Sequence, residues 1–350
     1  MLATHQCDRL FNMRNLLYLL FILGSACTPT ENKQPRKISP AFDHWKTAFD
    51  PTSQEINKLD SLGVNTIYLR LFDVSWNKNT QAPIPISKII INDQVLFEKY
   101  NMIPTIFITD ECIFYLKKSQ IKQLAENMIQ QIHISFAEKN ISQLQIDCDW
   151  TKNSKDNYFQ LLKAIKELAP TTILSATIRL HQIKFSATTG VPPVDRGMLM
   201  CYNMGNLRST TTKNSILDVM ETEKYLGNLS NYPLQLDIAL PLFSWAVLFR
   251  DDKFKGLMQN NLEDYQGLLS NDGSKIASVK KDTVINGISF FKNDKIRFEE
   301  SEPTGILKLA RMVRKKLKTD SIALSFYHLD SITLIKYNTY ELENIRHNLQ

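Results

Sequence analysis

The chain alternates short apolar runs rich in β-branched residues with longer segments whose apolar residues recur at helical spacing. This order is typical of βα units that build a parallel sheet. Eight strands are predicted, at residues 42–47, 64–72, 103–109, 143–149, 173–180, 197–203, 234–242 and 321–327. Eight such strands close a barrel, so the predicted fold class is α/β, a (β/α)8 TIM barrel. A doubly wound open sheet is the alternative, but no glycine-rich turn follows the first predicted strand to support nucleotide binding there.

The longest interruption of this alternation lies between the last two predicted strands and covers about residues 246–320. Inside it, residues 288–291 and 295–298 have the pattern of strands, and the polar residues 292–294 are typical of a turn between them. We therefore expect a small hairpin-containing insertion at the barrel mouth rather than a separate domain.

The N-terminal segment has the features of a bacterial export signal. Arg9 and Arg14 precede an apolar run at 16–23, and small residues at 24–26 lead to Cys27. The apolar run is about half the length that spans a bilayer. The run Leu-Gly-Ser-Ala-Cys resembles the lipobox of bacterial lipoproteins, which implies that Cys27 becomes the acylated first residue of a mature protein on a membrane of the cell envelope, facing periplasm or exterior. An ordinary secretory signal, with no role for Cys27, is the alternative.

These features predict a signal peptide at 1–26, a polar, proline-containing flexible tether at 27–40 and a barrel domain at 41–350. The chain has 43% hydrophobic and 22% charged residues, which is ordinary for a globular protein. Its net charge of +6 is spread along the sequence, so we expect no nucleic-acid partner. The densest basic cluster, around Lys315 and Lys318, lies on a helix-like segment and is interpreted as a solvated face.

Neither a metal site nor a cofactor is predicted. Cys112, Cys148 and Cys201 have no paired spacing that suggests a disulfide or zinc, and no set of His, Asp and Glu has a metal-ligand spacing.

Polar and aromatic residues gather where the predicted strands end. Barrel enzymes place their reactive groups at these carboxyl ends, which meet at one mouth. Carboxylates for proton transfer and flat rings for stacking are what a sugar site requires. The residues are Asp43, His44, Trp45, Asp73, Trp76, Asp110, Glu111, Asp147, Asp149, Trp150, Arg179, His181, Tyr202, Asn203, Trp245, Tyr327, His328 and Asp330.

The sharpest motif is Ile-Asp-Cys-Asp-Trp-Thr at 146–151. Because a strand alternates faces, Asp147, Asp149 and Thr151 point the same way. Two carboxylates inside a barrel raise the pKa of at least one of them unless they are hydrogen-bonded. The alternative is a structural role, in which both aspartates accept bonds from backbone amides at the strand end.

This motif resembles the fourth-strand signature of glycoside hydrolase family 18, the chitinases and their relatives, in which Asp-Gly-x-Asp-x-Asp-Trp-Glu is common. Residues 200–203 (Met-Cys-Tyr-Asn), 239–243 (Ala-Leu-Pro-Leu-Phe) and 327–330 (Tyr-His-Leu-Asp) resemble the sixth-, seventh- and eighth-strand motifs of that family. The four matches occur in the family's order and cover residues 143 to 330. The resemblance implies a glycan partner, Asp149 as reactive carboxylate, Asp147 tuning its pKa and Tyr202 holding the reacting ring. Substrate contacts are predicted from Trp45, Asp73, Asp110, Glu111, Arg179, Asn203, Trp245 and Tyr327.

The departures from the family pattern bear on activity. Leu144 and Gln145 stand where the family has aspartate and glycine, and Thr151 stands at the proton-donating glutamate. Threonine cannot donate a proton at neutral pH. Asp110 and Glu111 are the candidate replacements. Two functions therefore remain open: a glycosidase acting on glycans outside the cytoplasm, or a non-catalytic glycan-binding lipoprotein that resembles a chitinase.

Overall fold

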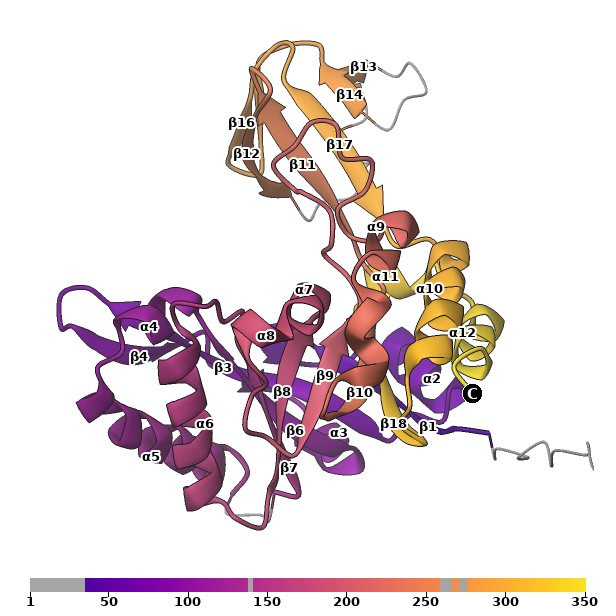
Figure 1. Ribbon diagram of the computed structural model, residues 1–350. Helices are drawn as coiled ribbons and strands as arrows, with labels where there is room; N and C mark the ends of the chain where they lie inside the picture. The colour runs from indigo at the N-terminus through magenta and orange to yellow at the C-terminus, as the bar shows by residue number, and fades with distance from the viewer. Residues whose placement is uncertain (1–34, 138–140, 259–264, 266, 271–275) are drawn as a thin grey trace, which may run out of the picture. The chain divides into compact units, whose positions relative to one another are not determined.

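The computed structural model describes residues 35–137, 141–258, 265, 267–270 and 276–350 (Figure 1). The predicted signal peptide, Cys27 and most of the predicted tether lie outside this part of the chain. Within it, no helix has both the length and the hydropathy needed to cross a bilayer.

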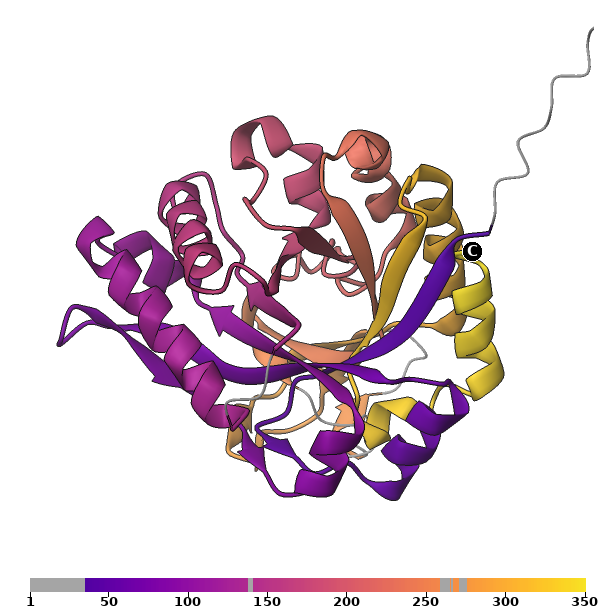
Figure 2. The ribbon, with the colours of Figure 1, turned by 90° about the horizontal axis from the view of Figure 1, so that it is seen from below.

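Eight parallel strands close into a ring, which confirms the predicted (β/α)8 barrel and excludes the open sheet (Figure 2). Each strand pairs with the next along the chain, β18 pairs with β1, and β1 pairs with β3 to close the ring. The barrel strands are β1 (Lys37–His44), β3 (Thr66–Asn77), β6 (Asn101–Ile108), β7 (Gln143–Asp147), β8 (Ile173–Arg179), β9 (Arg196–Met200), β10 (Gln235–Pro241) and β18 (Ser321–Tyr327).

The first strand begins earlier than predicted. β1 starts at Lys37 and pairs with β18 from its first residue, so residues 37–40 belong to the barrel and not to the tether expected over 27–40. The sequence did not reveal this start because Lys37 and Ser39 are exposed, so the first residues of the strand do not form an apolar run.

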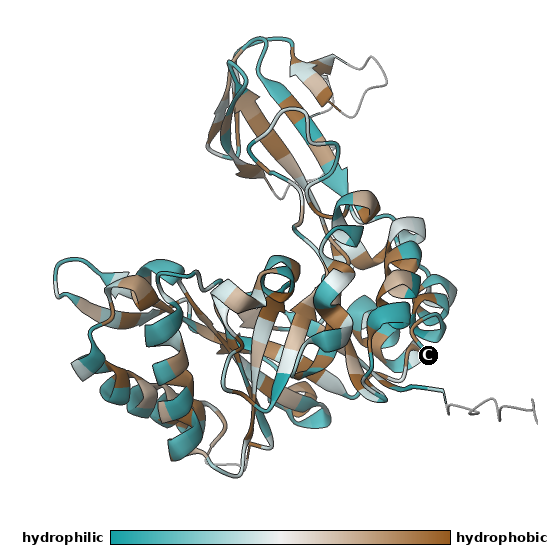
Figure 3. Cartoon of the chain, viewed as in Figure 1, coloured by the Kyte–Doolittle hydropathy of each residue, from teal (hydrophilic) through white to brown (hydrophobic). Residues whose placement is uncertain are grey.

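Helices surround the ring and bury one apolar face each against it. Figure 3 shows hydrophobic residues gathered on the strands and hydrophilic residues on the outer helical faces. The helix α5 (Lys118–Ser135) illustrates the pattern, since Ile121, Leu124, Met128 and Ile132 recur at helical spacing and are all buried. The other helical segments are α2 (Ser53–Ser61), α3 (Gln94–Lys99), α4 (Asp110–Tyr115), α6 (Lys155–Leu168), α7 (Leu180–Lys184), α8 (Ser186–Thr189), α9 (Val219–Glu223), η1 (Leu226–Asn231), α10 (Pro303–Lys316), α11 (Ser331–Leu334) and α12 (Thr339–His347).

Two small additions extend the barrel sheet or lie beside it. β4 (Ala82–Ile86) pairs antiparallel with the outer end of β3, and the short strands β2 (Ala48–Phe49) and β5 (Ile90–Ile91) pair with each other.

A second sheet forms between β10 and α10. It contains, in spatial order, β12 (Lys253–Met258), β11 (Ser244–Arg250), β17 (Lys295–Glu300), β14 (Ile276–Val279) and β13 (Leu269–Ser270), while β15 (Thr283–Ile285) and β16 (Ile288–Phe290) form a hairpin. One face of this sheet has its own apolar cluster, which includes Ala246, Leu248 and Ile296.

The strands predicted at 288–291 and 295–298 exist, but the prediction that they pair with each other is wrong. Residues 288–290 pair with β15, and β17 pairs with β11 and β14. The apolar residues of β17 explain this choice, because Ile296 lies opposite Leu248 and Phe298 opposite Ala246 in the small core.

Candidate functional site

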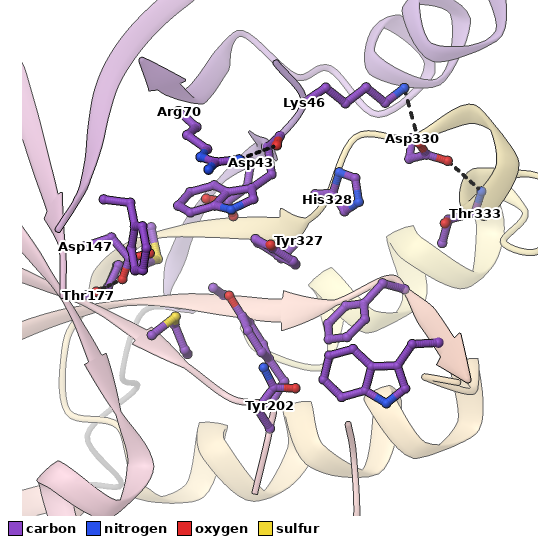
Figure 4. A pocket seen from close by; sticks show the side chains of 18 of the residues that line it. Asp43, Lys46, Arg70, Asp147, Thr177, Tyr202, Tyr327, His328, Asp330 and Thr333 are labelled. Atoms are coloured by element: carbon purple, nitrogen blue, oxygen red, sulfur yellow. Dashed lines mark hydrogen bonds and ion pairs between the residues drawn. The ribbon is translucent and has the colours of Figure 1, made fainter. Parts of the chain in front are cut away.

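The carboxyl ends of the barrel strands surround a cavity of about 690 Å3 (Figure 4). Most of the predicted site residues lie on its wall, although they come from six separate segments of the chain. Those that line it are Trp45, Asp147, Asp149, Arg179, Tyr202, Asn203, Trp245 and Tyr327. Asp73, Asp110 and Glu111 do not line it.

Asp147 is the last residue of β7 and its carboxylate is buried in the barrel. Burial and the nearby charge of Asp149 together raise its pKa to about 6, against a hydrogen bond that works in the opposite direction. That bond is donated by Thr177 Oγ1 to Asp147 Oδ1 at 2.5 Å, from the neighbouring strand β8. Asp147 can therefore hold a proton close to neutral pH.

Asp149 lies two residues farther toward the mouth and forms a bidentate ion pair with Arg179. The Nη2 atom of Arg179 is 2.6 Å from Asp149 Oδ2, and Arg179 Nε donates to the other carboxylate oxygen. Arg179 ends β8, which is the strand next to β7, so adjacent strand ends bring the two side chains together. Both oxygens of the carboxylate expected to be reactive are thus engaged by a guanidinium group.

Asp43 is another carboxyl on the cavity wall; the sequence placed it at the end of the first predicted strand but gave it no specific role in substrate binding or catalysis. It lies near the end of β1, is 4% exposed and accepts a hydrogen bond from Ser325 Oγ at 2.7 Å. Burial raises its pKa to about 7, more than the bond from Ser325 lowers it. The signal available in the sequence was its position directly after a buried phenylalanine in the first predicted strand.

Five rings form one side of the cavity, and we call them the aromatic wall: Trp45, Tyr202, Phe243, Trp245 and Tyr327. Tyr327 lies at its centre, with ring centroids 5.3 Å from Tyr202, 5.6 Å from Trp45 and 5.6 Å from Phe243. Trp245 extends the wall through Phe243, at 5.2 Å. Such a continuous apolar surface beside buried carboxyls suits a ligand with both flat faces and hydroxyl groups.

All three cations that line the cavity are paired with carboxylates. Besides the pair of Arg179 with Asp149, Arg70 Nε donates to Asp73 Oδ1 at 2.7 Å, and Lys46 Nζ lies 2.8 Å from Glu55 and 3.2 Å from Asp330. Asp73, predicted to contact substrate, does not line the cavity and instead pairs with Arg70, which does. The sequence contained a signal for Arg70, since it is the one charged residue in the second predicted strand.

The candidates for a replacement acid are engaged elsewhere. Glu111 Oε1 lies 3.0 Å from Lys78 Nζ on the surface. Asp110 accepts a hydrogen bond from Ser154 Oγ at 2.5 Å, and the same hydroxyl lies 3.2 Å from Thr151 Oγ1. Both acids belong to the first turn of α4, outside the cavity wall, so the expectation that either supplies the missing proton is not met by their positions.

Trp150 is turned away from the cavity. It is fully buried, stacks on Tyr158 at 5.2 Å and donates its indole hydrogen to Thr189 O at 2.9 Å. Its place between strand and helix agrees with the alternation that points Asp147 and Asp149 to the other face.

Several hydrogen-bonding atoms of the cavity residues have no partner among the described residues. They are Gln145 Oε1, Asn203 Oδ1 and His328 Nδ1. Gln145 is only 1% exposed, and it occupies the position where the family 18 signature has glycine. A buried acceptor without a partner is costly unless a ligand or water supplies the hydrogen. Among the described residues, no group of three or more His, Cys, Asp and Glu side chains could hold a metal ion.

Solved structures with a similar fold include chitinases and a spore cortex-lytic enzyme. A chitinase from Chromobacterium violaceum superposes with a TM-score of 0.53 at 10% sequence identity, over 90% of this chain and 99% of that one. The spore cortex-lytic enzyme of Bacillus cereus gives a TM-score of 0.53 at 10% identity, over 90% of this chain and 75% of that one. The barrel has a chitinase-like fold. Neither the protein-family models nor the curated protein sequences match this chain.

Proposed function

We propose that this protein is a lipid-anchored barrel of the cell envelope that binds a glycan in its chitinase-like cavity and does not cleave it by the family 18 route. The observation that carries the proposal is the bidentate pair between Arg179 and Asp149, next to a threonine at the position of the proton donor. The family's proton-donating glutamate is replaced by Thr151, and the aspartate of the pair, Asp149, is bound by Arg179.

The family route needs a proton for the leaving oxygen and a carboxylate that interacts with the substrate's own N-acetyl group. The hydroxyl of Thr151 cannot supply that proton at neutral pH, and Thr151 does not line the cavity. Asp149 would first have to leave Arg179, which binds both of its oxygens. Binding of a glycan requires neither a proton donor nor the release of Asp149 from Arg179, and all five rings of the aromatic wall are present to contact it.

A glycan is the ligand class that fits the cavity best. Sugar rings present an apolar face and a rim of hydroxyl groups, which matches a wall of five rings beside Asp147 and Gln145. The structural similarity to chitinases and to a spore cortex-lytic enzyme supports chitin oligosaccharides and cortex fragments as the first ligands to try.

Hydrolysis by another route is a second candidate, and one observation favours it. Asp43 and Asp147 both line the cavity, and their pKa values are raised to about 7 and about 6. A buried carboxyl with such a pKa is suited to general acid catalysis. In this candidate, Asp43 or Asp147 would take the part of the absent glutamate.

The anchor is part of the same proposal. The lipobox-like run ending at Cys27 supports acylation of that cysteine, which would keep the cavity outside the cytoplasm, where structural glycans occur.

The test measures binding and turnover with the same glycans. Titration calorimetry with chitin oligosaccharides and cortex fragments should give saturable binding, and product analysis after long incubation should find no cleavage. Tyr327→Ala, at the centre of the wall, should weaken binding about 10-fold or more, as expected for removing a stacking ring. Phe114→Ala is the matched control, because Phe114 is a half-exposed ring on α4 that does not line the cavity. Turnover by the wild type would overturn the binding-only proposal and favour the second candidate.

A further inference from the structure

The end of the barrel opposite the cavity carries a group of exposed cations that we call the basic end face: Lys37, Arg314, Lys315, Lys316 and Lys318. Arg314, Lys315 and Lys316 form the last turn of α10, and Lys318 lies in the connection to β18. Lys37 begins β1 and pairs with Ser321, the first residue of β18. All five therefore surround the amino ends of two neighbouring barrel strands.

Arg36, which directly precedes β1, is hydrogen-bonded to the backbone at this end of the barrel. Its guanidinium donates to Leu317 O at 2.7 Å, to Thr319 O at 2.6 Å and to Leu349 O at 2.5 Å. The place where the described chain starts is thereby fixed to the connection that carries Lys318. Figure 1 shows the C-terminal end of the chain beside the start of β1 as well.

The cations of the basic end face have no ion-pair partner in the part of the chain that the structure describes. None of the ion pairs formed by the described residues includes any of the five. Asp320 is the one exposed carboxylate in the same connection. Cations in the last turn of a helix do stabilise its C-terminus, but this effect does not extend to Lys37 and Lys318, which lie outside α10.

We propose that the basic end face docks on the anionic lipid headgroups of the membrane in which Cys27 is anchored. The proposal rests in part on the lipidation of Cys27. From Cys27 to Arg36 the chain can extend at most about 30 Å, so an anchored Cys27 keeps the amino ends of β1 and β18 close to the headgroups. Lysine and arginine residues near an anionic surface are attracted to it within about one Debye length.

This orientation separates the two ends of the barrel. The barrel strands run from the basic end face to the cavity, a distance of roughly 25 Å for strands of seven or eight residues. With the basic end face on the membrane, the cavity opens away from the lipid, toward the glycans that the proposed function requires.

The experiment uses the predicted mature chain, residues 27–350, with Cys27→Ser, so that neither the signal peptide nor an acyl chain contributes, and sedimentation with two kinds of vesicle. One kind contains phosphatidylcholine only, and the other contains phosphatidylcholine with phosphatidylglycerol. Each basic residue near an anionic surface is worth about a fivefold change in partition coefficient. The variant Lys315→Gln/Lys316→Gln/Lys318→Gln should therefore bind the anionic vesicles on the order of 100-fold more weakly. Salt at 0.5 M shortens the Debye length to about 4 Å, so it should remove most of the vesicle binding of the protein with the unmodified basic end face.

The matched control is Lys117→Gln/Lys118→Gln/Lys152→Gln, which removes the same charge from exposed positions at the cavity end of the barrel. It should keep most of the binding. An equal loss in both triple variants, or equal binding to both kinds of vesicle, would overturn the proposal. The lipid anchor is judged separately, by mass spectrometry of Cys27. If Cys27 is acylated but the lysine substitutions do not weaken vesicle binding, the lipid anchor is supported and only the docking of the basic end face is refuted.

Discussion

The indole nitrogen of Trp245 donates a hydrogen bond to Glu299 Oε2 at 2.7 Å. The two residues lie opposite each other on β11 and β17 of the inserted sheet, so this bond fixes a ring of the aromatic wall within that sheet. Glu299 is buried and also pairs with Arg297, whose Nε lies 2.5 Å from its other carboxylate oxygen. Arg297 in turn donates to the backbone of Ser209 and Leu207, in the connection after β9. A carboxylate outside the cavity thus positions one of its rings and holds a barrel loop.

Glu299→Ala should therefore be one of the most destabilising single changes in the protein. It leaves the buried guanidinium of Arg297 without its partner, for which a loss of about 3–5 kcal/mol is typical. Urea unfolding measures this loss. Glu299→Gln, which keeps an acceptor for Trp245, should lose less stability and keep more of the glycan affinity than Glu299→Ala. Equal effects of the two changes would mean that the bond to Trp245 does not position the ring.

Asp149 and Arg179 allow a direct choice between binding and catalysis. If the cavity only binds, Asp149→Asn should change glycan affinity modestly and no variant should show turnover. If the second candidate is right and Asp149 takes part, Asp149→Asn should lower the rate about 100-fold or more. Product analysis is carried out with the wild type, Asp147→Asn and Asp149→Asn. Turnover by the wild type that is unchanged in both variants would show that the reaction takes place at another site.

Stability should fall as the pH rises through the range in which Asp43 loses its proton. The pKa of Asp43 is raised from 3.8 to about 7 in the folded protein, so the folded chain keeps this proton where the unfolded chain has already lost it. The unfolding free energy should therefore decrease between pH 4 and pH 7, by up to about 4 kcal/mol. Asp43→Asn should remove most of this decrease in urea titrations at several pH values. A slope that persists in the variant would assign the effect to Asp147 or to another group.

Gln145 should contribute to ligand recognition through its unpartnered oxygen. Gln145→Leu keeps a similar volume and removes the acceptor, so glycan affinity should drop about 10-fold, the value of one hydrogen bond. The melting temperature should stay the same or rise, because a buried acceptor without a partner disappears. Calorimetry that finds unchanged affinity would show that the ligand does not reach the bottom of the cavity.

Cys27→Ala should release the protein from membranes into the soluble fraction, since one cysteine is proposed to carry the anchor. Cell fractionation measures the release, and mass spectrometry of the wild type identifies the first residue and its acyl chains. A mature protein that starts at another residue, without modification, would show that the signal is an ordinary secretory one.

The sequence predicted the barrel well because its strands are short apolar runs separated by amphipathic helices, and each buries its own residues in the ring. It did not predict where β1 begins or which strands of the insertion pair. Those choices depend on contacts between distant residues, such as the packing of Ile296 against Leu248, and local alternation does not contain them.

The site was predicted in part for the same reason. Strand parity and strand order were enough to bring Asp147, Asp149 and Tyr202 to one cavity. The partners of the charged side chains were not predictable in this way. The path of the loops at the mouth decides that Glu111 pairs with Lys78 and does not reach the cavity. In the same way, Asp110 accepts a hydrogen bond from Ser154 on the next loop.

The pairing of Lys46, Arg70 and Arg179 with carboxylates also bears on how quickly a ligand finds the cavity. Because the lining cations are all paired and a neutral glycan carries no net charge, the encounter proceeds by diffusion without electrostatic steering. The association rate of a neutral glycan should then hardly change with ionic strength. The opposite end of the barrel, with its unmatched lysines, would respond strongly to the same salt. If the basic end face docks on lipid headgroups as proposed, a change in salt concentration would weaken or strengthen that docking while the rate of ligand capture stays the same.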